Sequence, residues 1–263
     1  MAVIDIAKMS AHMSAANARF LDTEDGVKDS TAYLRGVAST FPGANVKCSV
    51  ERGRAEDLII EKAAADTRML LTMATHGRSG LNRFFLGSVA EKVLRGTVNP
   101  LLLVRATEET KPDGEATLKS IIVPLDESEL PESVLPMIAG LAKKLDLEVL
   151  LFRAYHIPSY AYAVNEGYAV NYDELVSAVR DKATEYLDKK ATELKKLGVA
   201  KVSSVTKEGF AADEIISLGQ KTPDNLVSMC SHGRSGVRRW MLGSIAETVV
   251  RHSGDPILIT RPE

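Results

Sequence analysis

The sequence predicts an α/β protein built from two tandem copies of one unit, each with a doubly wound parallel sheet. The segment THGRSGLNRFFLGSVAEKVLRG begins at Thr75, and SHGRSGVRRWMLGSIAETVVRH begins at Ser231. An offset of roughly 156 residues aligns the two segments, which marks a duplicated unit. In each copy, apolar runs typical of buried parallel strands alternate with amphipathic segments. Alternation of this kind forms right-handed βαβ units.

The second copy contains each element of a five-stranded domain in order. SIIVPLDESE is a buried strand that ends at Asp126, LPESVLPMIAGLAKKLD is a helix, and LEVLLFRAY is a second apolar strand. A long amphipathic segment that ends at Gly198 predicts a helix with a solvated charged face. A third strand before Gly209, another helix and a fourth strand up to Cys230 follow. IAETVVRH then has helical spacing, and DPILITRP, opened by proline, is the final strand.

The first copy repeats the later part of this order and is incomplete at its start. By the constant offset, Met1 falls on Ile157. The first strand, the first helix and most of the second strand, roughly 36 residues, are therefore expected to be missing. The segment AVIDI can be a remnant strand, but the pattern alone leaves this open. We expect a truncated copy, through gene-model error or degeneration, that is less stable than the complete one.

A polar linker separates the two copies. The stretch ATEETKPDGEATLK contains Pro112 and Gly114 and has the composition of an interdomain connection. We place the incomplete domain at residues 1–106, the linker at residues 107–118 and the complete domain at residues 119–263. Because an apolar strand at a sheet edge needs a partner, we expect the two halves to pair through PLLLVR and PILITR.

Composition limits the classes of function. The formal net charge is −2 and no run of like charges occurs, so neither a nucleic-acid footprint nor a polybasic membrane anchor is indicated. No signal-peptide pattern and no run of about 18 apolar residues is present, so we expect a soluble, cytoplasmic protein without membrane association. The two cysteines, Cys48 and Cys230, lie in apolar runs of different halves, a pattern typical of reduced, buried thiols.

The glycine loop between the fourth strand and the last helix has the composition of an anion site. Glycine allows a phosphate to approach backbone N–H groups at the positive end of a helix. Ser88 and Ser244, each just after a glycine, can serve as helix N-caps or offer a hydroxyl to a phosphate. Neither a P-loop nor a G-x-G-x-x-G motif is present. Of the loop arginines, which are more often solvated, we select Arg234 as a phosphate ligand.

Other polar and aromatic residues suggest no further chemistry. His76 and His232 occupy matching positions, but no other Cys, His or carboxylate recurs at ligand spacing, so we assign no metal site. The motif residues form no paired carboxylates, Ser-His-Asp set or Mg-binding aspartate pair, so we assign no catalytic residue. Five tyrosines crowd the stretch after the second strand, where they can form a nucleotide lid, a partner surface or a packing layer. These are Tyr155, Tyr160, Tyr162, Tyr168 and Tyr172.

Together these motifs resemble the universal stress protein family, here as a tandem pair. The carrying pattern is G-x2-G-x9-G-[ST] after the fourth strand, with V-P-x-D on the first strand. In both copies another residue replaces the first glycine of the motif: Ala74, a small change, and Cys230, which we expect to add bulk beside the ligand. The family motif matches Gly77, Gly87 and Ser88 in the first copy, and Pro124, Asp126, Gly233, Gly243 and Ser244 in the second.

The resemblance implies a flavodoxin-like sheet of order 3-2-1-4-5 with ATP, with or without Mg²⁺, at the switch point between strands 1 and 4. It implies that Pro124 and Asp126 line the adenosine pocket and that Ala154 faces the adenine. Four residues of the second copy then surround the phosphates: Gly233, Arg234, Gly243 and Ser244. A degenerate second site is implied at Gly77, Arg78, Gly87 and Ser88. The family's dimers also imply that the domains pair within the chain and that the protein forms homo-oligomers.

The function implied by the resemblance is a stress-response protein that senses or sequesters ATP without rapid catalysis. Two alternatives stay open. One is a slow ATP-hydrolysing or adenylyl-transferring enzyme, and the other is an interaction module with degenerate nucleotide pockets. Neither the stress nor the protein partner follows from the residues.

Overall fold

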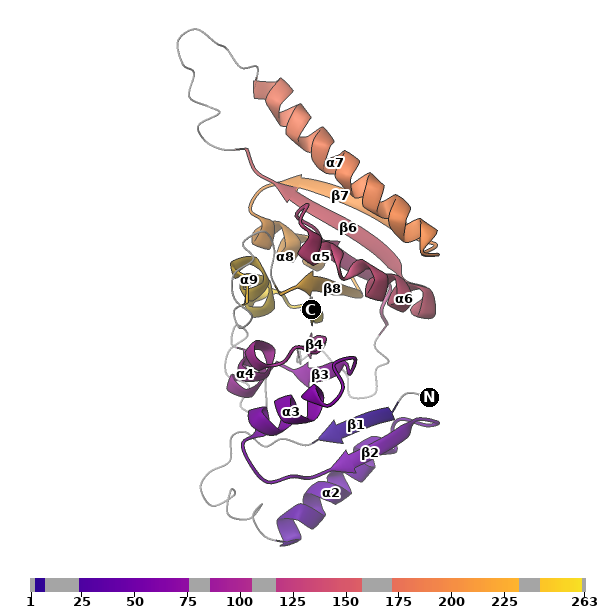
Figure 1. The fold of residues 1–263 in the computed structure, drawn as a ribbon, viewed down its shortest axis with the longest axis vertical. Coiled ribbons are helices and arrows are strands. Elements are labelled where there is room, and N and C mark those ends of the chain that lie inside the picture. Colours follow the sequence, from indigo (N-terminus) through magenta and orange to yellow (C-terminus); the bar gives the residue numbers. More distant parts are fainter. Residues whose placement is uncertain are drawn as a thin grey trace.

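The computed structural model describes residues 3–7, 24–75, 86–105, 117–157, 172–231 and 242–261. A seven-stranded sheet runs through most of the molecule in the order β3-β4-β9-β8-β5-β6-β7, and β1 and β2 form a separate two-stranded sheet (Figure 1). The strands are β1 (Val3–Ala7), β2 (Asn45–Ser49), β3 (Leu71–Ala74), β4 (Leu101–Val104), β5 (Ser120–Pro124), β6 (Glu148–Tyr155), β7 (Val202–Glu208), β8 (Asn225–Cys230) and β9 (Ile257–Thr260). The helices are α2 (Glu24–Ala38), α3 (Ala55–Ala64), α4 (Ser88–Gly96), α5 (Glu129–Glu132), α6 (Leu135–Leu145), α7 (Tyr172–Lys196), α8 (Ala211–Lys221) and α9 (Ser244–His252).

The second copy has the predicted strand order. Strand β5 pairs in parallel with β6 on one side and β8 on the other, while β6 pairs with β7 and β8 with β9. In the numbering of a five-stranded unit this is 3-2-1-4-5, so the doubly wound fold is confirmed. The connections cross over through helices, as parallel strands require.

Neighbouring residues of the central strands face two different cores. Ile121 and Val123 of β5 point into a cluster with Ile138 of α6 and Leu187 of α7. Ile122, between them, joins a second cluster on the opposite face, which includes residues of α8 and α9. The near-continuous burial of β5 and β8 follows from helices on both faces of the sheet.

The first copy contains more of the second strand than the constant offset predicts. Ile4 of β1 pairs with Val46 of β2, just as Val149 of β6 pairs with Val202 of β7. Strand β1 therefore takes the place of the second strand, although it has 5 residues where β6 has 8. The constant offset fails here because the next helix is shorter in the first copy. Helix α2 has 15 residues, whereas its equivalent α7 has 25. The described residues hold no counterpart of the first strand or first helix, as predicted.

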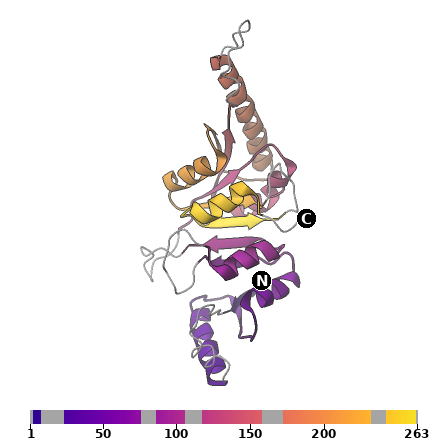
Figure 2. The same ribbon diagram turned by 90° about the vertical axis from the view of Figure 1, so that its left-hand side faces the viewer.

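The two copies join through their final strands, which confirms that expectation. Strands β4 and β9 pair antiparallel, with Leu102 opposite Leu258, and they lie side by side in Figure 2. The copies also cap each other's last helices. The Arg105 guanidinium donates to the backbone oxygen of Arg251 at 2.9 Å, and the Arg261 guanidinium donates to that of Leu94. These contacts follow the pseudo-twofold relation of the copies, since 105 and 261 are equivalent positions.

Four charged side chains complete this junction. The Arg251 guanidinium lies 3.1 Å from the Glu91 carboxylate, and the Arg95 guanidinium lies 3.3 Å from the Glu247 carboxylate. Each arginine also pairs with the glutamate one turn earlier on its own helix. The network therefore holds α4 and α9 together across the domain boundary.

An ion-pair cluster joins α3 to α4 within the first copy. Glu56 is only 8% exposed, and its Oε1 accepts hydrogen bonds from Lys92 at 2.6 Å and Arg54 at 2.9 Å. The bond from Lys92 is the main cause that lowers the pKa of Glu56 from 4.5 to about 2. The cluster stabilises the packing of α3 on α4 wherever this carboxylate is ionised.

The lowered pKa of Glu56 predicts how the stability of the fold depends on pH. A carboxyl with a lowered folded-state pKa stabilises the fold above its unfolded-state pKa, and this stabilisation is lost as the pH falls through the folded-state value. The free energy of unfolding of the native chain should therefore exceed that of Glu56→Gln by a constant amount above pH 4.5. This difference should vanish as the pH falls to about 2. Denaturant unfolding at several pH values measures it. Glu61→Gln, at an exposed position of the same helix, is the control, and an unchanging Glu56→Gln difference over this range would contradict the assignment.

The cysteines match the expected pattern in part. Neither forms a disulfide bond: Cys230 is buried, whereas Cys48 is only half-buried. Over the ranges that the structure describes, no helix combines the length and apolar composition needed to cross a membrane.

Candidate nucleotide site

The nucleotide crevice is expected at the carboxyl ends of β5 and β8, where the strand order of the second copy reverses. The chain leaves β5 toward α6 on one face, while β8 leads toward α9 on the other. In open α/β sheets, ligands bind outside the strands at this switch point. Pro124, Asp126 and Ala154 all lie at this end of the sheet, on β5, just after it and near the end of β6.

The turn after β5 fixes the position of Asp126. The Leu125 backbone N–H donates to the Phe152 carbonyl at 2.9 Å, which keeps the chain in line with β6. Asp126 is half-buried, and its Oδ1 accepts hydrogen bonds from both the backbone N–H and the hydroxyl of Ser128. Glu127 between them has a left-handed backbone, with φ of 67°. The carboxylate of Asp126 is thereby held in one orientation at the crevice.

A salt bridge that the sequence analysis did not identify ties the ends of β5 and β6 together. The Arg153 guanidinium lies 3.3 Å from the Glu127 carboxylate, and both side chains are mostly buried, at 15% and 23% exposure. Its Nη1 donates to the Ala154 carbonyl at 3.0 Å, and Lys182 of α7 approaches Glu127 at 3.7 Å. The signal was an arginine inside the apolar run LEVLLFRAY. Breaking the pair would leave a charge with poor solvation, so it fixes the turn that carries Asp126.

Ala154 packs inward. Its side chain is 9% exposed and belongs to the same apolar cluster as Phe152. The residues that follow carry a second feature that the sequence analysis missed: the rings of His156 and Phe210 stack with centroids 5.4 Å apart. Phe210 is 70% exposed, and the Gly209 backbone N–H bonds to the Tyr155 carbonyl at 2.9 Å. An exposed aromatic surface therefore borders the carboxyl ends of β6 and β7.

The tyrosine cluster is described only in part. Tyr155 is half-buried at the end of β6. Tyr160, Tyr162 and Tyr168 lie outside the described residues, as does the side chain of Tyr172.

Both glycine loops close in the same way. The Gly243 backbone N–H donates to the Ser231 carbonyl at 2.8 Å, and the Gly87 N–H donates to the Thr75 carbonyl at 2.7 Å. The two glycines share one conformation, with φ and ψ of −63° and 149° at Gly243 and −59° and 145° at Gly87. A Cβ on Gly87 would lie 2.9 Å from the Thr75 oxygen, so the close approach of the chain requires glycine there.

The serines are the first helical residues. Gly87 and Gly243 are the N-cap residues, so the expectation that Ser88 or Ser244 can cap the helix is wrong. Both serines are exposed, and neither N-cap residue makes a side-chain bond to the helix end. The first backbone N–H groups of α4 and α9 therefore have no hydrogen-bond acceptor from an N-cap side chain. Four predicted ligands lie outside the described residues: Gly77, Arg78, Gly233 and Arg234.

The expectation that Cys230 adds bulk beside the ligand is wrong. Its side chain is 6% exposed and packs in the apolar cluster between the sheet and helices α6 and α7. Strand alternation explains this, because residue 230 points to the same face as Leu226.

The first copy retains one wall of the equivalent crevice. Its Gly87–Ser88 turn matches that of the second copy. The wall made by β5 has no counterpart among the described residues of the first copy, because β3 ends the sheet order.

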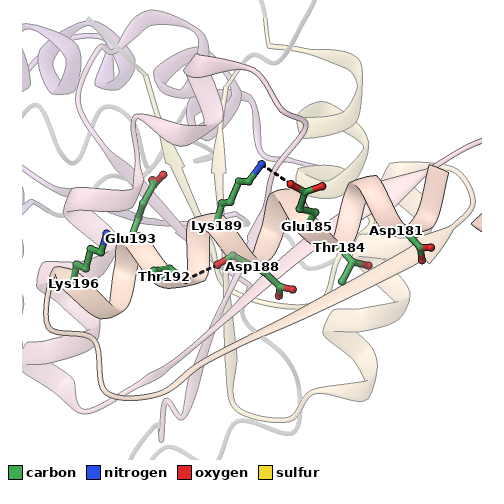
Figure 3. A pocket seen from close by; sticks show the side chains of 8 residues that line it. All are labelled: Asp181, Thr184, Glu185, Asp188, Lys189, Thr192, Glu193 and Lys196. Carbon is green, nitrogen blue, oxygen red and sulfur yellow. Dashed lines mark hydrogen bonds and ion pairs between the residues drawn. The ribbon is translucent and has the colours of Figure 1, made fainter. Parts of the chain in front are cut away.

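A hollow of about 640 Å³ lies elsewhere, along the outer face of α7 (Figure 3). Charged side chains line it, and they pair along the helix itself, as Lys189 does with Glu185 at 2.8 Å. It is an open hollow along a solvated helix face and does not coincide with the switch point. Among the described residues, no three His, Cys, Asp or Glu side chains are placed to hold a metal ion.

Comparison with known proteins points to a single family. The model of the universal stress protein family matches residues 6–105 and 117–261. A universal stress protein of Methanocaldococcus jannaschii is 26% identical over 149 residues, which cover 57% of this chain and 85% of the relative. A second from the same organism is 26% identical over 155 residues, covering 54% of this chain and 94% of that protein. The crystal structure of a universal stress protein from Archaeoglobus fulgidus superposes with a TM-score of 0.67 at 18% identity, covering 98% of this chain and 85% of that one.

Proposed function

This chain belongs to the universal stress protein family, and on that premise we propose that its second copy binds ATP and senses or sequesters it without rapid turnover. One observation carries the proposal. Among the described residues, only the second copy has two adjacent parallel strands of which one leads into a turn like Pro124–Asp126 and the other toward a helix with an N-cap glycine. This combination offers one wall to a nucleoside and the other to phosphates.

The roles of individual residues follow from their chemistry. The oriented Asp126 carboxylate accepts hydrogen bonds from ribose hydroxyls, and Pro124 and the backbone at Ala154 lie toward the base. Gly243 and Ser244 present backbone N–H groups and a hydroxyl to the phosphates at the positive end of α9. We assign Gly233 and Arg234 to the same phosphates from the family motif.

The residues fit a nucleotide better than a resident metal. The N-terminus of α9 lacks a capping side chain, and an anion can take its place. The described residues provide no three-ligand metal cluster, so Mg²⁺ would be held mainly by the phosphates, as is usual for this ion.

The charges near Asp126 favour binding over catalysis. Glu127, the neighbouring carboxylate, is engaged by Arg153 and Lys182, which makes it a poor general base. The two cysteines form no disulfide with each other, which supports the proposal of a reducing, cytoplasmic setting. We also propose that the chain associates with further copies, as the family resemblance implies.

Steady-state phosphate release separates this function from the enzyme alternative. Saturating ATP with Mg²⁺ should give no turnover above the spontaneous rate, while equilibrium dialysis under the same conditions detects bound nucleotide. Rapid phosphate release that Asp126→Asn abolishes would establish an enzyme instead. If neither binding nor phosphate release is detected, the result would favour the third alternative, an interaction module with degenerate nucleotide pockets.

A further inference from the structure

The outer edge of β3 differs from the matching edge in the second copy. Strand β8 lies between β9 and β5, whereas β3 pairs with β4 and, among the described residues, has no strand on its other side. By the internal duplication, residues 69–75 correspond to residues 225–231. The second copy therefore provides a direct reference for what covers this edge.

The backbone of β3 is arranged to pair with another parallel strand. The Leu71 N–H donates to Pro100 and the Thr75 N–H to Val104, both on the β4 side. Alternate residues of a parallel strand bond to opposite sides, so the backbone groups of Thr72 and Ala74 face outward. In β8 the corresponding groups face β5, which pairs in parallel with Ile122 opposite Val227.

One face of β3 and β4 is also exposed at two positions. Leu70 is 52% exposed, whereas its equivalent Leu226 is 4% exposed. Val104 is 37% exposed, whereas its equivalent Thr260 is 7% exposed. In the second copy, Leu226 lies within the cluster to which β5 and α6 contribute, and Leu258, two residues before Thr260, belongs to the same cluster. An occupant that restores this burial must therefore bring a helix as well as a strand.

A second edge lies nearby. Strand β1 occupies the place of the second strand, which in a complete unit pairs with the first. In Figure 1 the two-stranded sheet lies beyond β3, on the side away from β4. Both strands that flank the first strand in a complete unit are thus present in the first copy.

We propose that the edge of β3 and the face of Leu70 and Val104 bind a strand–helix segment of another polypeptide, with the chemistry of residues 117–146 of this chain. The strand would add in parallel to β3 as β5 adds to β8, and the helix would cover Leu70 as α6 covers the equivalent face. Edge-to-edge pairing with β3 of a second copy does not satisfy the site, because it brings no helix to this face. This is peptide recognition by β-strand addition.

The test uses the whole chain and a labelled synthetic peptide of residues 117–146. Fluorescence anisotropy should show saturable binding of one peptide, and hydrogen exchange should show new protection at residues 71–75. Thr72→Pro removes an outward N–H, and Leu70→Asp places a charge on the open face; each should weaken binding at least about tenfold. Thr206→Pro, at an outward position of the opposite edge strand β7, is the matched control.

Three outcomes would overturn the proposal. One is the absence of saturable binding, and another is an equal loss of affinity in Thr206→Pro. The third is a β3-mediated dimer, dissociated by Thr72→Pro in light scattering, that the peptide does not compete with. Leu70 is exposed, so Leu70→Asp keeps the test valid if Thr72→Pro unfolds the first copy.

Discussion

Gly243→Val should lower the affinity for ATP by on the order of a hundredfold or more, while Gly87→Val should leave it nearly unchanged. Valine at 243 should crowd the Ser231 carbonyl, as a Cβ on Gly87 would crowd that of Thr75, and so distort the loop that presents backbone N–H groups to the phosphates. The described part of the first copy has no counterpart of β5, so phosphate contacts at Gly87 would gain no burial of the base. Calorimetric titration of ATP into each variant measures the difference.

The two substitutions are well matched. Both glycines have nearly the same backbone angles and donate their N–H to an equivalent oxygen, so the structural cost of valine should be similar. Thermal melting of both variants checks this. Asp126→Ala provides an independent change on the other wall and should also weaken binding. ATP affinity that survives Gly243→Val but is lost in Gly87→Val would place the site in the first copy.

Amide exchange should be about a thousandfold or more faster in β1 and β2 than in β5 and β8. A two-stranded sheet is marginally stable by itself, and the missing first strand leaves an edge of β1 without a partner in the described sheet. Strands β5 and β8 each pair on both sides and are buried on both faces. Hydrogen exchange followed by mass spectrometry resolves these segments.

Strand β4 is the internal reference for this comparison. It belongs to the first copy but pairs with β9, so its amides should exchange about as slowly as those of the second copy. Protection of β1 and β2 equal to that of β5 in the isolated chain would show that the first copy is as stable as the complete one.

Elements that repeat in the sequence were predictable. Apolar periodicity and the duplication were enough for the succession of elements from β5 to β9 along the chain. The sheet order came from the family resemblance, and the pairing of β4 with β9 came from the need of an apolar edge strand for a partner together with that resemblance. The position of β1 was not predictable in this way. Helix α2 is shorter than α7, so a constant offset misaligns every residue before these helices, including β1. Alignment by strand register in place of sequence offset recovers it.

The placement of Asp126 and Gly243 at strand ends was predictable, but the contacts that support this region were not. Asp126 and Gly243 lie where a parallel sheet brings strand ends together. The Arg153–Glu127 pair depends on tertiary contact between strands β5 and β6, and the His156–Phe210 stack on contact between the segments after β6 and β7. The inward direction of Cys230 could have been inferred from its alternation with Leu226, since strand residues two and four apart share a face.

The stoichiometry of ATP binding to the native chain tests the central claim most directly. Calorimetric titration should give close to one site per chain, because among the described residues only the second copy has both the strand that carries Asp126 and the glycine-capped helix. Two equivalent sites would contradict this account, since the first copy would then bind the nucleotide without the strand that carries Asp126.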